Sequence, residues 1–142
     1  LPIYRRKSAG IVLMKNTRLF LCGDLLAPFV CKEFYGRVDI ISGPPPFISS
    51  TTVRRMPSEI SKLEPVLAFD AGPFGVSLFL RLMANAPLYL KAVGWLFFEV
   101  GAGQASGVLK RLENDPRYYN PQTHCDDNGK IRVVAAQKSE AV

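Results

Sequence analysis

The chain has 142 residues, of which 48% are hydrophobic and 21% charged. This composition excludes disordered and fibrous proteins, and the length suffices for one domain with a buried core. We therefore predict a single domain over residues 1–142. The net charge of +6 favours acidic partners such as RNA. Because the basic residues form no long run, a solvated surface is the favoured interpretation, and RNA binding is the weaker one.

The cysteine content indicates the redox compartment of the protein, and the hydropathy indicates whether a segment could cross a membrane. The three cysteines, Cys22, Cys31 and Cys125, are odd in number and form no C-x-x-C pair, which argues against a disulfide framework and against a zinc site. We therefore expect no metal site. We also expect the protein to work in a reducing compartment, either the cytoplasm or an organellar matrix. The most apolar candidate for a membrane span, Ala86 to Val100, is short and carries charged residues, so no membrane association is expected.

The first half of the chain alternates apolar runs with loop-forming residues. Leu19 to Cys22 is typical of a buried strand, and Leu25 to Tyr35 of a short helix with a proline near its first turn. Val38 to Ile41 predicts a second buried strand. The run Gly43 to Pro46 then ends regular structure. Ile48 to Pro65 is polar and mixed, which favours an excursion or a lid.

The second half is more regular. Apolar residues at helical spacing predict a helix within Phe74 to Leu90, and Gly94 to Val100 predicts a third buried strand. Gln104 to Leu112 indicates a second helix. Tyr118 to Cys125 and Lys130 to Ala136 flank an Asn-Gly pair, which is the strongest short signal for a β-hairpin. The expected class is therefore α/β, with an antiparallel hairpin at the edge of the sheet.

Polar and conformationally special residues follow three of the predicted strands. They are Asp24, the run Gly43 to Phe47, and Glu99 to Gly101. In open α/β sheets, ligands bind beyond the carboxyl ends of the strands. Asp24 can accept a hydrogen bond from an amino group, or it can cap a helix from Leu25 onward. The prolines before Phe47 can form a target site or only a rigid turn.

Two other patterns receive a structural interpretation first. Glu99 can contact a ligand or simply pair with a nearby base. His124, Cys125 and Asp126 include a nucleophile and a base, but neighbouring residues of a strand point to opposite faces, so no catalytic geometry follows. Tyr118 and Tyr119 can contact RNA, although a place on the solvated surface is the favoured interpretation.

Several motifs resemble one enzyme family. Val38 to Ile48 reads VDIISGPPPFI and resembles the FDLIVSNPPYI stretch of the HemK/PrmC family, whose members methylate the N5 atom of a glutamine in peptide-chain release factors. The segment around Glu64 and Pro65 resembles YEPxxAL, and Ala71 to Gly75 resembles GGxxG. Gly94 to Gln104 resembles GGxLxxEIGxxQ. Phe20 to Leu26 resembles the GDL segment and Arg132 to Val134 the closing RVV, so the similarity spans about residues 17 to 137, in order.

The resemblance implies a fold and a set of site residues. The family fold is a Rossmann-like class I methyltransferase sheet ordered 3-2-1-4-5-7-6, of which this chain would hold strands three to seven, its C-terminal part. The implied cofactor is S-adenosyl-L-methionine, with Asp24 contacting its adenine. The implied target-site residues are Pro44, Pro45, Pro46 and Phe47. The implied substrate-binding residues are Glu64, Pro65 and Glu99.

The chain departs from the family pattern in two ways. No G-x-G motif lies upstream of Asp24, so the Gly-rich loop that would hold the cofactor is missing and weak binding is expected. Pro44 occupies the position of the motif asparagine, which orients the target amide, and proline has no side-chain hydrogen-bonding group. The sequence therefore does not decide whether the chain takes part in methyl transfer to a glutamine amide. One alternative is a methyltransferase with a different substrate, such as the amino group of a nucleobase. The other is a non-catalytic subunit in a larger assembly.

The same comparison predicts an incomplete sheet. Strand one of the family would normally cover the outer edge of Val38 to Ser42, and an unpaired row of backbone groups there is costly. We expect that edge to be covered by a second copy of the chain, by a partner chain, or by the segment Ile11 to Cys22 moved across. The other implied partner is the protein substrate, a release factor.

Overall fold

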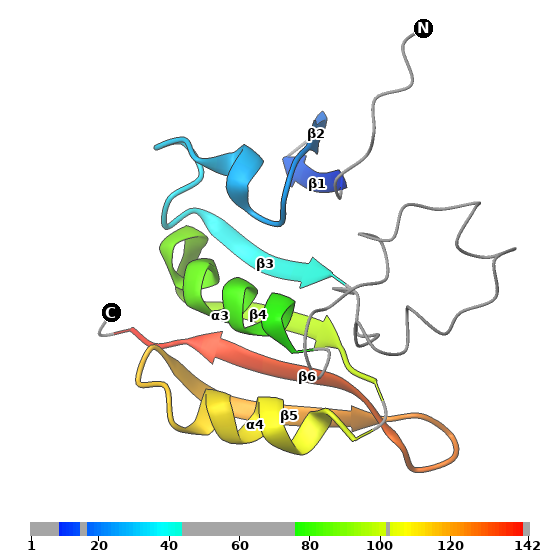
Figure 1. Cartoon of the computed structure of the whole chain (residues 1–142). Coiled ribbons are helices and arrows are strands. Elements are labelled where there is room, and N and C mark those ends of the chain that lie inside the picture. Colours follow the sequence, from blue (N-terminus) through cyan, green and yellow to red (C-terminus); the bar gives the residue numbers. More distant parts are fainter. Residues whose placement is uncertain (1–8, 15–16, 44–75, 102, 141–142) are drawn as a thin grey trace, which may run out of the picture.

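The computed structural model describes residues 9–14, 17–43, 76–101 and 103–140, and for residues 9–22 it describes the backbone alone. In chain order the elements are β1 (Ala9–Met14), β2 (Thr17–Cys22), the 3-10 helix η1 (Ala27–Phe29), β3 (Val38–Gly43), α3 (Ser77–Tyr89), β4 (Leu90–Glu99), α4 (Ala105–Glu113), β5 (Tyr118–Cys125) and β6 (Ile131–Lys138). Figure 1 shows their arrangement.

The main sheet has four strands in the order β3-β4-β6-β5. Strand β3 runs parallel to β4, whereas β4 with β6 and β6 with β5 are antiparallel pairs. This is the order that strands four, five, seven and six take in the expected sheet. The α/β class and the antiparallel hairpin at the edge are confirmed. At the hairpin turn, the Asp126 carboxylate accepts hydrogen bonds from the backbone of Asn128 and Lys130, and Gly129 takes the positive φ of 74°.

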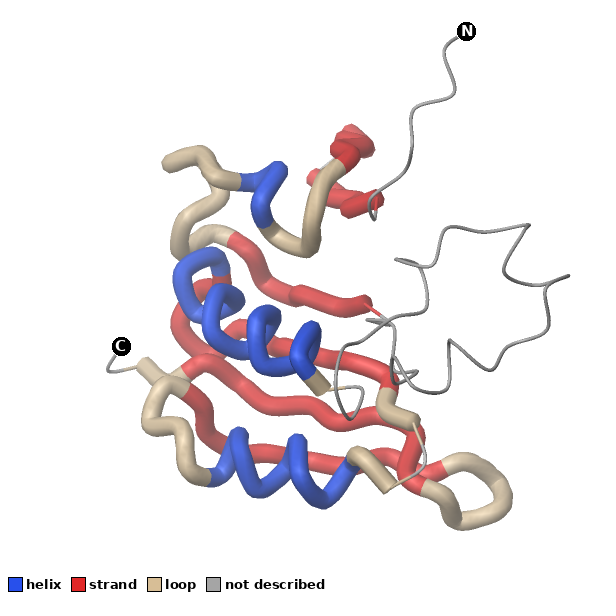
Figure 2. The backbone as a smooth tube through the Cα atoms, in the orientation of Figure 1, coloured by secondary structure: helices blue, strands red, loops and turns tan. Residues whose placement is uncertain are grey.

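Helices α3 and α4 lie on the same side of this sheet (Figures 1 and 2). Phe79 of α3 packs against Phe98 of β4 with ring centroids 5.3 Å apart, and both side chains are essentially inaccessible to solvent. Val108 and Leu112 of α4 are buried in the same core. Burial of apolar side chains between the helices and one sheet face is therefore the main stabilising contribution, at roughly 25 cal/mol per Å² of apolar surface. None of the helices in the described part of the chain is long and apolar enough to cross a membrane.

The N-terminal strands form a separate sheet of two strands. β1 and β2 pair antiparallel, from Ala9 with Cys22 to Met14 with Thr17. The expectation that Ile11 to Cys22 crosses to the outer edge of β3 is therefore wrong. Two strands separated by a two-residue connection satisfy each other's backbone groups locally, which costs less chain entropy than a distant pairing. In the described residues no strand pairs with the outer edge of β3, and the other two expected coverings stay predictions.

The predicted helix over Leu25 to Tyr35 is also wrong. Only Ala27 to Phe29 form a short 3-10 helix, and turns follow it. Leu25 has a φ of +50°, which an α-helix cannot include. The apolar residues of the segment serve the core in another way, because Phe29 is buried and meets Phe34 edge to face at 5.5 Å.

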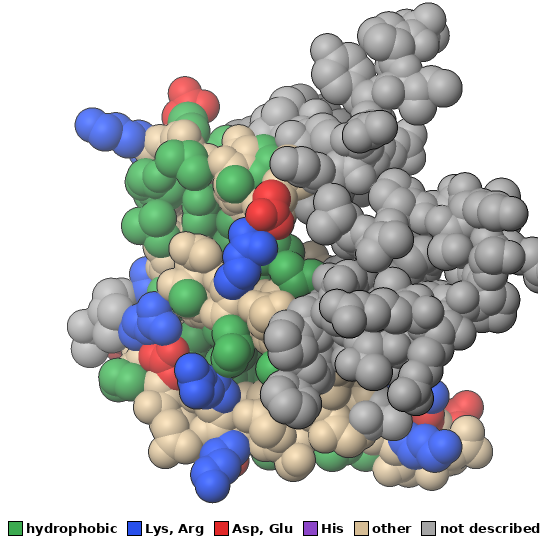
Figure 3. Space-filling model, viewed as in Figure 1, with side chains coloured by type: hydrophobic (Ala, Val, Ile, Leu, Met, Phe, Trp, Pro, Cys, Tyr) green, Lys and Arg blue, Asp and Glu red, His purple; other side chains and the backbone are tan. Residues whose placement is uncertain are grey.

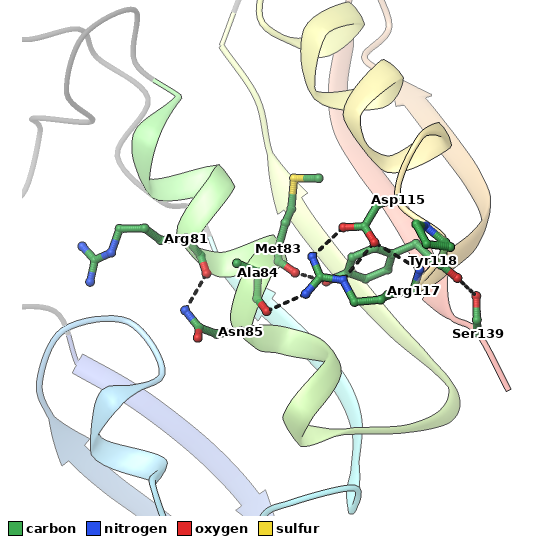
Figure 4. A network of polar contacts seen from close by, with 9 residues as sticks. Arg81, Met83, Ala84, Asn85, Asp115, Arg117, Tyr118 and Ser139 are labelled. Carbon is green, nitrogen blue, oxygen red and sulfur yellow. Dashed lines mark hydrogen bonds and ion pairs between the residues drawn. The ribbon is translucent and has the colours of Figure 1, made fainter. Parts of the chain in front are cut away.

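Pro87 lies inside α3, in the last turn before the helix ends at Tyr89. A proline has no N–H, so the carbonyl of Met83, four residues earlier, lacks its usual helical donor. The hydroxyl of Tyr118 donates to that carbonyl instead, at 2.6 Å (Figure 4). Arg117 adds a bond from Nη1 to the carbonyl of Ala84 at 3.0 Å. The start of β5 therefore completes the end of α3 and fixes the two layers against each other.

Candidate functional site

The carboxyl ends of β3 and β4 lie side by side, because the two strands are parallel. Ser42 pairs with Phe97, and Gly43 with Phe98. A hollow of about 210 Å³ opens there, lined by Ser42, Gly43, Phe97, Phe98, Glu99 and Val133. This is the place where open α/β sheets bind their ligands. The structure thus brings together two of the three strand ends selected from the sequence.

Glu99 is the acidic group of this hollow. It is the last residue of β4, its backbone pairs with Val133 of β6, and its side chain is exposed. Four ion pairs occur among the described residues, and Glu99 takes part in none of them. The interpretation that Glu99 merely pairs with a nearby base therefore receives no support from the described part of the chain. A free carboxylate at the rim of a hollow can accept hydrogen bonds from N–H donors of a ligand.

The turn that follows Glu99 is held by the side chain of Gln104, the last residue of the motif that begins at Gly94. The Gln104 side-chain carbonyl accepts a hydrogen bond from the N–H of Gly101 at 2.9 Å. The Gln104 N–H donates in turn to the Gly101 carbonyl at 3.1 Å. In the sequence, this residue is visible only as a glutamine between a strand end and a helix, which does not specify the partner of its side chain.

Asp24 lies after β2, away from the hollow residues in sequence, and its carboxylate is engaged. Arg81 of α3 donates to Asp24 Oδ2 at 2.6 Å, with both side chains about half exposed. The helix-cap interpretation does not hold, since the residue preceding η1 is Leu26 and no side chain caps it. Contact between Asp24 and an adenine stays a prediction. One paired carboxylate on the surface does not by itself make a cofactor site.

The remaining predicted site residues are Pro44, Pro45, Pro46, Phe47, Glu64 and Pro65, which lie outside the described residues. Gly43 is the last described residue before them and lines the hollow. The run Pro44 to Phe47, which is predicted to form a target site, therefore follows β3 directly in the sequence.

Three weaker interpretations can be compared with the structure. Tyr118 is buried and donates to Met83, so both interpretations of this residue, the favoured place on the solvated surface and the contact with RNA, are wrong, whereas Tyr119 is exposed. The described residues contain no group of three or more side chains that could hold a metal ion. Lysine and arginine side chains are spread over the face in Figure 3, several of them beside an acidic side chain. A scattered distribution of this kind fits a solvated surface.

Comparison with known proteins identifies the sequence family, although no protein-family model matches the chain. The chain is 31% identical over 98% of its length to the release factor glutamine methyltransferase of Thermodesulfovibrio yellowstonii, of which it covers 48%. It is 34% identical over 81% of its length to the enzyme of that name from Geobacter sulfurreducens, covering 39% of that protein. By sequence, the chain is a relative of the HemK/PrmC family.

A third comparison gives the same result. The release factor glutamine methyltransferase of Thermosynechococcus vestitus is 30% identical over 89% of the chain, which covers 45% of that protein. The chain thus spans about half the length, or less, of these relatives. The recognition made from the motifs VDIISGPPPFI and GWLFFEVG is confirmed by matches over most of the chain. The strand order β3-β4-β6-β5 agrees with it independently.

Proposed function

We propose that this chain supplies the acceptor side of an S-adenosylmethionine-dependent methyltransferase that modifies a glutamine of a release factor. The observation that carries the proposal is the match of 98% of the chain to a release factor glutamine methyltransferase. The parallel ends of β3 and β4 support it, because Gly43, which lines their hollow, is followed in the sequence by the run Pro44 to Phe47.

The residues of this half would bind and orient the acceptor. The Pro45 carbonyl can accept one hydrogen bond from a side-chain amide, and Phe47 offers a flat face for stacking. Glu99 can accept a second hydrogen bond at the rim, and Glu64 with Pro65 would contact the rest of the substrate. S-adenosylmethionine, when bound, supplies the methyl group. Among the described residues only Asp24 is a candidate contact for it, so a complete cofactor site needs further residues.

The proposal is tested by measuring methyl transfer. The 142-residue chain is combined with the half of the Thermodesulfovibrio relative that it does not match, and incubated with methyl-labelled S-adenosylmethionine and a release factor. We expect label on the release factor, and none when the acceptor glutamine is replaced by alanine. Label on nucleic acid instead would support the nucleobase alternative. No label on any substrate, although each half is folded and the halves associate, would support the non-catalytic one.

Pro44 decides whether the acceptor site still suits an amide. Replacing it by asparagine restores the side chain that orients the target nitrogen in the family motif, so Pro44→Asn should raise transfer to the release factor by ~10-fold or more. The matched control is Pro116→Asn, the same change at an exposed proline before β5, which should leave the rate unchanged. A fall in activity with Pro44→Asn would show that Pro44 belongs to the site of a different substrate.

A further inference from the structure

We propose that Gln104 is a positioning residue that holds Glu99 at the rim of the strand-end hollow. This proposal rests on the proposed role of Glu99 as a substrate contact. Gln104 itself does not line the hollow. It acts through the turn between β4 and α4, whose first residue, Gly101, comes two positions after Glu99.

The turn is closed by two hydrogen bonds between the same two residues. Gly101 donates its N–H to the Gln104 side-chain carbonyl at 2.9 Å, and Gln104 donates its N–H to the Gly101 carbonyl at 3.1 Å. The first helical bond, from Val108 N–H to the Gln104 carbonyl at 3.1 Å, continues directly from this pair. Gln104 therefore links the segment after β4 to the first turn of α4. Removal of its side-chain carbonyl would leave the Gly101 N–H without this acceptor.

The residues on both sides of the turn lie in the core. Val100, on one side of the turn, is fully buried, and Ala105, on the other, is 8% exposed. The chain must reverse between them over a short stretch while both ends stay in the core. Gly103 helps with a φ of +81°, a conformation that suits glycine. Val100 N–H bonds the Arg132 carbonyl of β6 at 2.9 Å, so a looser turn would pull at the last ladder bond next to Glu99.

Two backbone contacts and one buried ring hold the end of β4 among the described residues. Phe98 is buried and fixed by Phe79, so it anchors the strand from within. Glu99, next in sequence, points to the other face and is exposed. Among the described residues no ion pair holds its side chain, so within this part of the chain its position follows from the backbone. That backbone is held by the ladder with Val133 on one side and by the turn with Gln104 on the other.

The structural part of the proposal is tested without any activity measurement. Hydrogen exchange of the Gly101 amide is followed by NMR in the 142-residue chain. Gln104→Leu keeps the size of the side chain but removes the acceptor, and should lower protection of Gly101 by about tenfold. Gln104→Glu keeps an acceptor and should restore protection. Unchanged protection in Gln104→Leu would overturn the positioning role, whatever the substrate is.

The functional part uses the reconstituted methyl-transfer assay. Gln104→Leu should raise KM for the release factor about fivefold, leave KM for S-adenosylmethionine unchanged, and be rescued by Gln104→Glu. Gln122→Ala on the outermost strand β5 is the matched control. In a Glu99→Gln background, Gln104→Leu should have no further effect. Additive effects would refute action through Glu99, whereas a chain that transfers no methyl group in any form would refute the proposed function instead.

Discussion

The hydroxyl of Tyr118 substitutes for the backbone donor that Pro87 removes from α3, and this gives a quantitative prediction. Tyr118 is 6% exposed and Met83, whose carbonyl accepts its hydrogen bond, is 2% exposed. Tyr118→Phe keeps the packed ring and deletes only the hydrogen bond. Because the Met83 carbonyl then stays buried without this donor, the free energy of unfolding should fall by about 2 kcal/mol.

A second substitution tests the cause. In Pro87→Ala the new backbone N–H at position 87 can donate to the Met83 carbonyl as in a regular helix. In that background Tyr118→Phe should cost less, about 1 kcal/mol, since the carbonyl retains one donor. The coupling between Tyr118 and Pro87 is then about 1 kcal/mol, within the range for residues that share one partner.

The measurement is urea unfolding of the four proteins of this cycle, followed by circular dichroism. Tyr119→Phe is the matched control, because Tyr119 is the adjacent tyrosine and is 39% exposed. Its free energy of unfolding should change by less than ~0.5 kcal/mol. If Tyr118→Phe costs the same in the unsubstituted chain as in the Pro87→Ala variant, the reasoning is refuted, because the hydroxyl would then not be compensating for the proline.

Three further predictions follow from the same structure and sequence. Burial raises the pKa of Tyr118 above its usual range. The unfolded chain loses the hydroxyl proton near pH ~10, whereas the folded chain keeps it. The free energy of unfolding should therefore fall as pH rises above this value, and the fall should be smaller in Tyr118→Phe. Val93 has a φ of +56°, so Val93→Gly should raise the free energy of unfolding by about 1 kcal/mol. The neighbouring substitution Gly94→Ala should lower the free energy of unfolding, because the Cβ of the new alanine would lie 3.1 Å from the Val38 carbonyl oxygen. Destabilisation by Val93→Gly would show that the strain is absent. Titration calorimetry of the chain alone with S-adenosylmethionine should show binding weaker than micromolar, and micromolar affinity would contradict the expected need for a separate Gly-rich loop.

Elements with a strong local signal could be predicted from the sequence. Helix α3, strand β4 and the β5-β6 hairpin follow from apolar spacing and from the Asn-Gly pair, and their boundaries differ from the predicted ones by a few residues. The segment from Leu25 to Tyr35 could not be predicted in this way. Its apolar residues suggested a helix, but the conformation is decided by contacts distant in sequence, such as the bond from the Gly36 N–H to the Leu88 carbonyl at 3.0 Å.

The candidate site shows the same division. The position of Glu99 at a strand end follows from the sequence, because a buried apolar run stops there. The contribution of Gln104 does not follow from composition or periodicity, since a polar residue before a helix has several possible partners and only the folded structure shows which N–H its side chain binds. Likewise, the engagement of Asp24 by Arg81, 57 residues away in sequence, depends on how α3 packs. Candidate residues can therefore be predicted from the local sequence, whereas their hydrogen-bond and ion-pair partners depend on the tertiary structure.

The outer edge of β3 is unpaired among the described residues and lies next to the candidate site. Ile40, in the middle of this strand, is 58% exposed, and the neighbouring Ile41 is 9% exposed, so the first lies outside the core and the second lies in it. Its last two residues, Ser42 and Gly43, line the hollow. A strand laid along this edge would satisfy the backbone of β3, would lie beside the face of Ile40, and would end next to the same hollow. We therefore expect a strand that completes the sheet at β3 to lie close to the candidate site as well. If the proposed function holds, we therefore expect methyl transfer only when this edge is covered.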